Sequence, residues 1–174
     1  LFEKLDRESL DASTWMATRW GAAPWANDAV FKHGIEAPLV RNCSRIAVAP
    51  TKSTALIMGG ISEGINPDPG MSYTQSTAGG EMSRITPVFL DLMKEKGQYN
   101  KATILSIDKA YGSVQHLDWL TDEEKRVFRT AFEIDQNVIV RLAAQRGKWI
   151  DQWQSLNLFF ASEADPRYVA EVHK

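Results

Sequence analysis

A run of small hydroxyl residues directly after a proline has the clearest chemical potential in this sequence of 174 residues. The run is Pro50-Thr51-Lys52-Ser53-Thr54, and apolar residues follow it as far as Gly59-Gly60. This order predicts a tight turn that opens a short helix, where the first backbone N–H groups lack intrahelical acceptors and point outward. Together with the helix dipole, the hydroxyl groups and the lysine charge, these N–H groups could hold a phosphate or a diphosphate.

An ordinary capped helix explains the same residues equally well, because Ser and Thr are common helix caps. The residues of the run therefore leave both interpretations open. The spacing Gly-x-x-x-x-Gly-Lys-Ser/Thr does not occur in the sequence, which argues against a P-loop ATPase or kinase.

The overall composition limits the classes of function. Hydrophobic residues make up 44% of the chain and charged residues 24%, which is typical of a domain with a core rather than a disordered tail or a membrane protein. The net charge is −2 and Lys and Arg form no stripe, so we expect no direct binding of nucleic acid. The apolar stretches are too short to cross a bilayer, no leader is visible, and the single cysteine, Cys43, fits a reducing compartment; we expect a cytoplasmic protein.

The elements around the hydroxyl run should place it between a strand and a helix. Helices are predicted over residues 1–20, 51–58, 87–96, 101–111, 120–132 and 135–146 and from Asp165 onward, with at most a short one at 26–32. Strands are predicted over 44–49 and 155–160, and a hairpin over 71–77 and 81–86. Thr121 and Glu124 have the spacing of a capping box. This order predicts an α/β fold, and we expect a single partial domain over residues 1–174.

Two features predict that the sequence is a fragment of a longer chain. It begins at Leu1 inside an amphipathic pattern and ends at Lys174 inside another. It also carries six tryptophans, whose apolar surfaces need burial within this chain or by neighbours that it lacks: Trp15, Trp20, Trp25, Trp119, Trp149 and Trp153.

Several separated segments resemble the late barrel region of class I ribonucleotide reductase large subunits. The first runs from Arg41-Asn42 through the hydroxyl run to Ser62-Glu63-Gly64-Ile65-Asn66-Pro67. The second is Gly112-Ser113-Val114-Gln115-His116-Leu117-Asp118-Trp119, with Ala144-Gln145-Arg146 after it. The third is Ile150-Asp151-Gln152 with Gln154-Ser155-Leu156-Asn157-Leu158. They keep the family's order over nearly the whole chain and are most similar to the bacteriophage-type branch.

The resemblance implies the C-terminal portion of a ten-stranded α/β barrel, incomplete in this chain, from an enzyme that reduces ribonucleotides to deoxyribonucleotides for DNA synthesis. Carried over residue by residue, Pro50 shapes the turn, and the substrate diphosphate receives hydrogen bonds from Thr51, Lys52, Ser53 and Thr54. The family's reaction begins with a cysteine thiyl radical. No Asn-Leu-Cys-x-Glu motif and no Tyr-Tyr pair occurs here, so we expect no catalytic residue in this chain and no activity from it alone.

The resemblance also implies partners. They are a ribonucleoside diphosphate substrate, the remaining part of the large subunit, a small radical-generating subunit with a metal centre, and thioredoxin or glutaredoxin. We expect this segment to bind no metal and no cofactor, and ATP or dNTP effectors to bind elsewhere in the intact enzyme. Three alternatives remain: the cobalamin-dependent reductase class, a non-catalytic interaction or assembly module derived from a reductase, and an unrelated phosphate-binding domain.

The remaining polar residues have plainer explanations. We expect Cys43 to be a buried structural thiol, His116 to make a structural hydrogen bond, and the acids 122–124 to complement a helix dipole. Gly64 indicates a backbone position that needs conformational freedom or a close approach, and both a substrate-side role and a plain turn remain open. Trp153 stands where the family pattern has a small polar residue. Asn157 could face either side of its strand.

Overall fold

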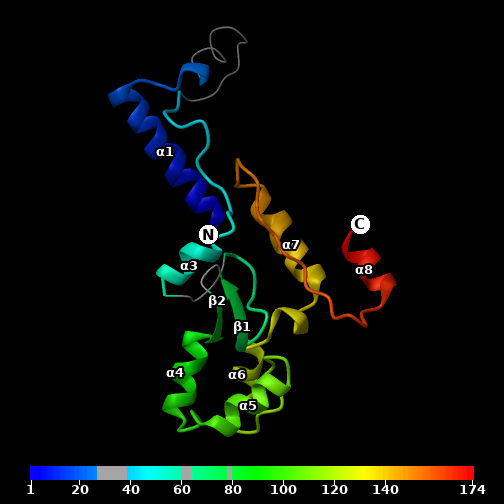
Figure 1. Ribbon diagram of the computed structural model, residues 1–174. Helices are drawn as coiled ribbons and strands as arrows, with labels where there is room; N and C mark the ends of the chain where they lie inside the picture. Colours follow the sequence, from blue (N-terminus) through cyan, green and yellow to red (C-terminus); the bar gives the residue numbers. More distant parts are fainter. Residues whose placement is uncertain (27–38, 60–63, 78–79) are drawn as a thin grey trace. The chain divides into compact units, whose positions relative to one another are not determined.

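The computed structural model describes residues 1–26, 39–59, 64–77 and 80–174, whose elements follow one another as Figure 1 shows. These residues form two compact units. The first comprises Leu1–Ala49 and Arg141–Ser155, and the second comprises Pro50–Val140 and Leu156–Lys174. That all of them form one domain stays a prediction. None of the helices in the described ranges has the length and apolar character that crossing a membrane requires.

A long helix is the main element of the first unit. The helix α1 spans Phe2–Trp20, as its apolar spacing predicted, and it ends at Gly21, whose φ of 86° suits glycine because no Cβ is present. Ser13 and Ala17, one turn apart, are its buried residues. The helix α7 spans Gln136–Gly147, and its part from Arg141 onward belongs to this unit.

The second unit contains the predicted hairpin. Strand β1 (Ser72–Thr77) pairs with β2 (Gly80–Ile85) in antiparallel register, with Ser72 opposite Ile85. Helices α4, α5 and α6 lie at one end of this hairpin in Figure 1. The helical elements of the unit, besides the start of α7, are α3 (Lys52–Ile57), α4 (Pro87–Glu95), α5 (Lys101–Lys109), α6 (Asp122–Val127), a 3-10 turn (Ala131–Glu133) and α8 (Pro166–Val172).

The core of the second unit forms around Phe89. Phe89 and Met93 lie one turn apart on α4 and expose no surface, and Ile107 of α5 is also buried. The Phe89 ring stacks on Trp119, with centroids 6.1 Å apart, and meets Phe128 edge to face at 5.1 Å. Because full burial of one such side chain stabilises a fold by about 1.5–3 kcal/mol, this cluster explains why α4 and α6 pack together.

Gly112, the first residue of the segment 112–115, lies where two stretches of backbone in this unit approach each other closely. Gly112 N donates to Ile107 O at 2.9 Å, and Gly112 O accepts from Met71 N at 2.8 Å. Its φ is 84°, and an added Cβ would lie 2.6 Å from Gly70 Cα. Only glycine fits a backbone crossing this close.

The next three residues of the segment hold the same region together. Ser113 Oγ donates to Glu133 Oε1 at 2.5 Å, Val114 is fully buried, and Gln115 Nε2 donates to Lys125 O at 2.8 Å. The whole Gly-Ser-Val-Gln segment therefore has structural explanations.

A buried glutamine links the end of the chain to this unit. Gln136 is 1% exposed, and its Nε2 donates to Ala131 O at 2.9 Å and to Ile134 O at 2.6 Å. Gln136 N donates to Tyr168 Oη at 2.7 Å. Partial burial, and then the neighbouring Asp135 carboxylate, raise the pKa of Tyr168. This position fits a structural tyrosine.

Two predicted strands do not form within the described residues. The segment 44–49 makes one isolated parallel bridge, at Val48, and 155–160 makes no strand pairing. In the latter segment side-chain amides take the backbone donors: Asn66 Oδ1 accepts from Asn157 N at 3.0 Å, and Gln136 Oε1 accepts from Phe159 N at 2.9 Å. A strand requires a neighbouring backbone, which the residues of the segment do not specify.

The predicted helix over 120–132 is wrong in its length. The capping box of Thr121 and Glu124 is confirmed, but α6 ends at Val127. A second capping box, from Thr130 and Glu133, then starts the 3-10 turn. The predicted helix is therefore divided into α6 and a separate 3-10 turn. The predicted short helix at 26–32 lies mostly outside the described residues.

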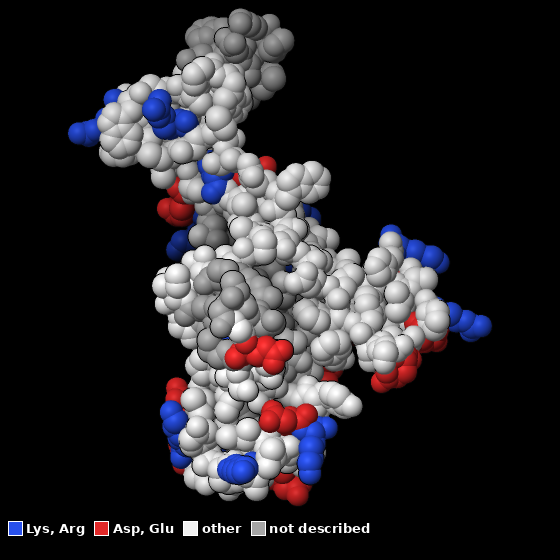
Figure 2. All heavy atoms as spheres, in the orientation of Figure 1, with Lys and Arg blue, Asp and Glu red and all other residues white. Residues whose placement is uncertain are grey.

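The surface agrees with the composition. Acidic and basic side chains are interspersed on the face that Figure 2 draws, and the described part of that face shows no continuous basic stripe. Four of the six tryptophans are exposed, and Trp153 is 92% exposed. Its side chain therefore contributes little packing.

We predict that Gly112→Ala lowers the free energy of unfolding by about 3 kcal/mol, because the substitution combines a left-handed φ with a clash. Gly97→Ala is the matched control, since Gly97 has a φ of 66° and nothing within 4 Å of an added Cβ. We expect this control to lose only about 1 kcal/mol. Urea unfolding followed by circular dichroism measures both changes, and equal losses would rule out the steric role of Gly112.

We predict that Lys96→Met reduces the sensitivity of the fold to acid. The hydrogen bond from Lys96 Nζ, 2.6 Å from Glu124 Oε2, and then the Thr121 amide lower the pKa of Glu124. A lowered pKa stabilises the fold above the ordinary value of the carboxyl, and this stabilisation disappears as the pH falls through the folded value. The free energy of unfolding, measured from neutral to acid pH, should fall less steeply in Lys96→Met than in the unaltered chain. Lys94→Met, which removes an exposed contact of 3.7 Å to Asp91, should leave this pH dependence unchanged.

Candidate functional site

The hydroxyl run follows a short stretch of parallel backbone pairing in the first unit. Val48 pairs with Gln154 in parallel: Val48 N donates to Trp153 O at 3.3 Å, and Ser155 N donates to Val48 O at 2.7 Å. One step earlier, Gln152 N donates to Ile46 O at 3.2 Å. Pro50 comes two residues after Val48 and has no N–H to continue such a ladder, so the pairing ends where the run begins.

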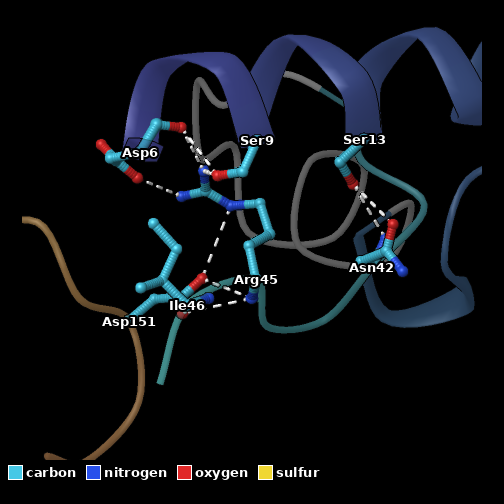
Figure 3. Close-up of polar contacts among 7 residues, drawn as sticks. All are labelled: Asp6, Ser9, Ser13, Asn42, Arg45, Ile46 and Asp151. Carbon is cyan, nitrogen blue, oxygen red and sulfur yellow. Dashed lines mark hydrogen bonds and ion pairs between the residues drawn. The ribbon is translucent and has the colours of Figure 1, made fainter. Parts of the chain in front are cut away.

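One aspartate holds the start of this pairing, as Figure 3 shows. Asp151 accepts from two consecutive amides, Arg45 N at 2.9 Å and Ile46 N at 2.9 Å. A carboxylate binds two amides well because it has two oxygens and a full charge. Asp151 therefore sets the register of residues 45–48 against 152–155.

The Arg45 side chain connects the same point to α1. Its Nη2 lies 2.8 Å from Asp6 Oδ1, and its Nη1 donates to Asp6 O at 2.8 Å and to Ser9 Oγ at 2.9 Å. Its Nε lies 3.5 Å from Asp151 Oδ2. The Arg45 side chain is only 17% exposed, so these contacts are screened less than those of a surface ion pair.

A second contact holds α1 to the same segment (Figure 3). Buried Ser13 Oγ donates to Asn42 Oδ1 at 3.1 Å and accepts from Asn42 N at 3.0 Å. Arg41 N donates to Ser13 O at 3.1 Å. The Arg41-Asn42 pair thus has a structural role in the first unit.

The hydroxyl run itself forms the predicted helix start in the second unit. Thr51 is the N-cap of α3, with no side-chain capping hydrogen bond, and Ala55 N donates to Thr51 O at 2.6 Å. Ala55 is buried, whereas Pro50 and Thr54 are exposed. The side chains of the two residues between Thr51 and Thr54 lie outside the description. The helix start is therefore not capped by its own N-cap side chain, as an ordinary capped helix would be, and its first amides point away from the helix.

One predicted residue is placed differently. Cys43 is exposed, so the prediction of a buried thiol is wrong; Trp25 Nε1 donates to its Sγ at 2.7 Å. Whether this thiol is buried depends on residues distant in sequence, which the residues around Cys43 do not reveal. His116 Nε2 lies 3.2 Å from Ser106 Oγ, which agrees with a structural hydrogen bond.

Further residues of the segments that resemble the family have these positions. Gln154 Nε2 donates to Ala143 O at 2.7 Å, so it binds the backbone of α7. Asn157 is exposed. Gly64 has a φ of 138°, which confirms the need for glycine, and Glu63 lies outside the described residues. Within the described part of the chain, no group of three or more His, Cys, Asp and Glu side chains is arranged to hold a metal ion.

The sequence did not reveal the roles of Arg45 and Asp151. They stand 106 residues apart, and each lies in a different one of the segments that resemble the family. For Arg45 the available signal was a charged residue at the start of a predicted strand, and for Asp151 it was a charged residue shortly before one.

We predict that Asp151→Ala lowers the free energy of unfolding by about 2 kcal/mol, because two half-buried amides and the Arg45 guanidinium lose their acceptor. Asp91→Ala is the control: it removes an exposed carboxylate 3.7 Å from Lys94, which should change stability by about 0.5 kcal/mol or less. Urea unfolding of the chain measures both, and equal effects would contradict the role of Asp151.

Comparison with known proteins supports the resemblance. The ribonucleoside-diphosphate reductase large subunit of Invertebrate iridescent virus 3 is 40% identical over 130 residues, which cover 73% of this chain and 21% of that protein. The large subunit of the same name from Danio rerio is 34% identical over 159 residues, which cover 91% of this chain and 19% of that protein. The chain thus spans less than a third of the length of these relatives.

A solved structure gives the same result. The Actinobacillus ureae class Id ribonucleotide reductase alpha subunit superposes with a TM-score of 0.80 and 34% identity, over 99% of this chain and 29% of that chain. The predicted α/β class, as an incomplete portion of the reductase barrel, is confirmed. The bacteriophage-type branch stays a prediction. A family model described as the barrel domain of ribonucleotide reductase matches residues 3–174, and this chain belongs to that family.

Proposed function

We propose that this chain is the part of a ribonucleoside-diphosphate reductase large subunit that holds the diphosphate of the substrate. The observation that carries the proposal is the helix start at Thr51, which has no side-chain capping hydrogen bond, in a chain of the reductase barrel family. Backbone amides at such a start are suited to phosphate oxygens. The complete subunit would reduce ribonucleoside diphosphates to deoxyribonucleotides.

In this proposal each residue of the run has a defined task. Pro50 ends the backbone pairing and shapes the turn. The amides and hydroxyls of Thr51, Ser53 and Thr54 donate to phosphate oxygens, and Lys52 supplies a positive charge. These contacts bind and orient the substrate without taking part in bond breaking, since the radical chemistry requires a cysteine motif that this sequence lacks.

The same proposal includes the partners of the complete enzyme. The rest of the large subunit would supply the radical cysteine, a small subunit with a metal centre would generate the radical, and thioredoxin or glutaredoxin would return the electrons. Nucleotide effectors would bind outside this segment. We therefore expect the isolated chain to be inactive and to bind diphosphates weakly.

We predict that Ser53→Ala combined with Thr54→Ala, in a complete large subunit carrying this segment, weakens binding of a ribonucleoside diphosphate by about 1–3 kcal/mol, through the loss of hydrogen bonds to a charged group. Equilibrium binding of the nucleotide measures the effect.

The matched control is Thr18→Ala combined with Ser162→Ala, which removes two exposed hydroxyls outside the run. It should leave the Kd unchanged. An unchanged Kd in the first double variant, with the fold intact by circular dichroism, would refute the phosphate site. Weakened binding of the nucleoside diphosphate with unaltered binding of the matching nucleoside would support it.

A further inference from the structure

An apolar groove with an acidic rim lies between α4 and α6 of the second unit. Its α4 wall consists of Val88, Asp91, Leu92 and Glu95. These residues are spaced at i, i+3, i+4 and i+7, which places them on one face of the helix. The open hollow that the lining residues enclose measures about 580 Å³.

The floor of this groove is apolar, and each wall carries a valine among polar residues. Leu92 and Phe128 are partly buried and pack against the core, so the floor is fixed. Val88 and Val127 also line the groove, from α4 and α6, and are 52% and 70% exposed. Two exposed valines beside an apolar floor leave apolar area that a partner could bury.

The rim of the groove carries negative charge that the described residues do not neutralise. Glu95 and Glu123 line it, and no cation of the described part of the chain lies within ion-pair distance of either. Asp91 has only the exposed contact of 3.7 Å with Lys94. Lys96 is already engaged with Glu124, at 2.6 Å.

We propose that this groove binds an amphipathic helical segment of a partner protein, with apolar side chains on one face and Lys or Arg beside them. An acidic segment would be repelled by the rim, and a purely apolar one would cover carboxylates without giving them a partner. Lys and Arg satisfy both requirements, because their methylene stems can lie on the valines while the charge reaches a carboxylate. Binding of an amphipathic helix in a groove with apolar surface is a recurring mode of recognition.

This surface is independent of the phosphate site. No residue of the hydroxyl run lines the groove, so the proposal stands or falls without the assignment of the run.

Fluorescence anisotropy of a labelled synthetic amphipathic helix of Leu and Lys, titrated with the purified 174-residue chain, tests the proposal. We expect binding that weakens as salt is added. Glu95→Gln combined with Glu123→Gln should weaken it by about fivefold, as expected for two rim ion pairs. Val127→Ser should weaken it as well, because apolar contact is lost.

The control is Glu163→Gln combined with Glu171→Gln, two exposed carboxylates outside the groove that change the net charge by the same amount. It should bind the peptide like the unaltered chain. Equal loss in both double variants would mean that net charge alone attracts the peptide, and this would overturn the proposal. Three other results would also overturn the proposal. They are no binding of the peptide, equal binding of a peptide with the same residues in scrambled order, and displacement of the bound peptide by spermidine at concentrations as low as those of the peptide. Circular dichroism confirms that each variant is folded.

Discussion

The contact between the Asp151 carboxylate and two successive amides is the interaction on which the first unit depends most. Arg45 N and Ile46 N both donate to it, and this fixes one short segment of backbone against another that is about a hundred residues away in sequence. The parallel pairing of Val48 with Gln154 follows from that register. A carboxylate suits this position because it accepts several hydrogen bonds without donating any.

Arg45 extends the same contact to a third segment. Its guanidinium reaches the Asp6 carboxylate and carbonyl and the Ser9 hydroxyl, so α1 is attached at the point where the two paired segments meet. Ser13 and Asn42 form a second attachment of the helix, one turn after Ser9. The first unit is thus organised by polar contacts of half-buried groups, whereas the second is organised by the aromatic cluster at Phe89.

The segments that identify the family differ in what they do. Gly112 permits a close approach to Gly70, Val114 fills the core, and Asp151 holds backbone amides. These are structural roles within the two units. In the hydroxyl run after Pro50, the N-cap side chain makes no capping hydrogen bond. Binding of the substrate by this run remains our proposal, because function resides in sites carried by a fold rather than in the fold.

The sequence alone determined the features that depend on neighbours a few residues away. Helix α1, the hairpin, the capping box at Thr121 and the helix start after Pro50 all follow from spacing and caps, and the ordered motifs identified the family. The tertiary structure decided which backbones pair, that Cys43 is exposed, that Asn66 and Gln136 replace strand partners, and that Asp151 and Arg45 meet. Local periodicity fixes helices because their hydrogen bonds lie within one turn, whereas pairing and burial depend on residues that approach only when the chain folds.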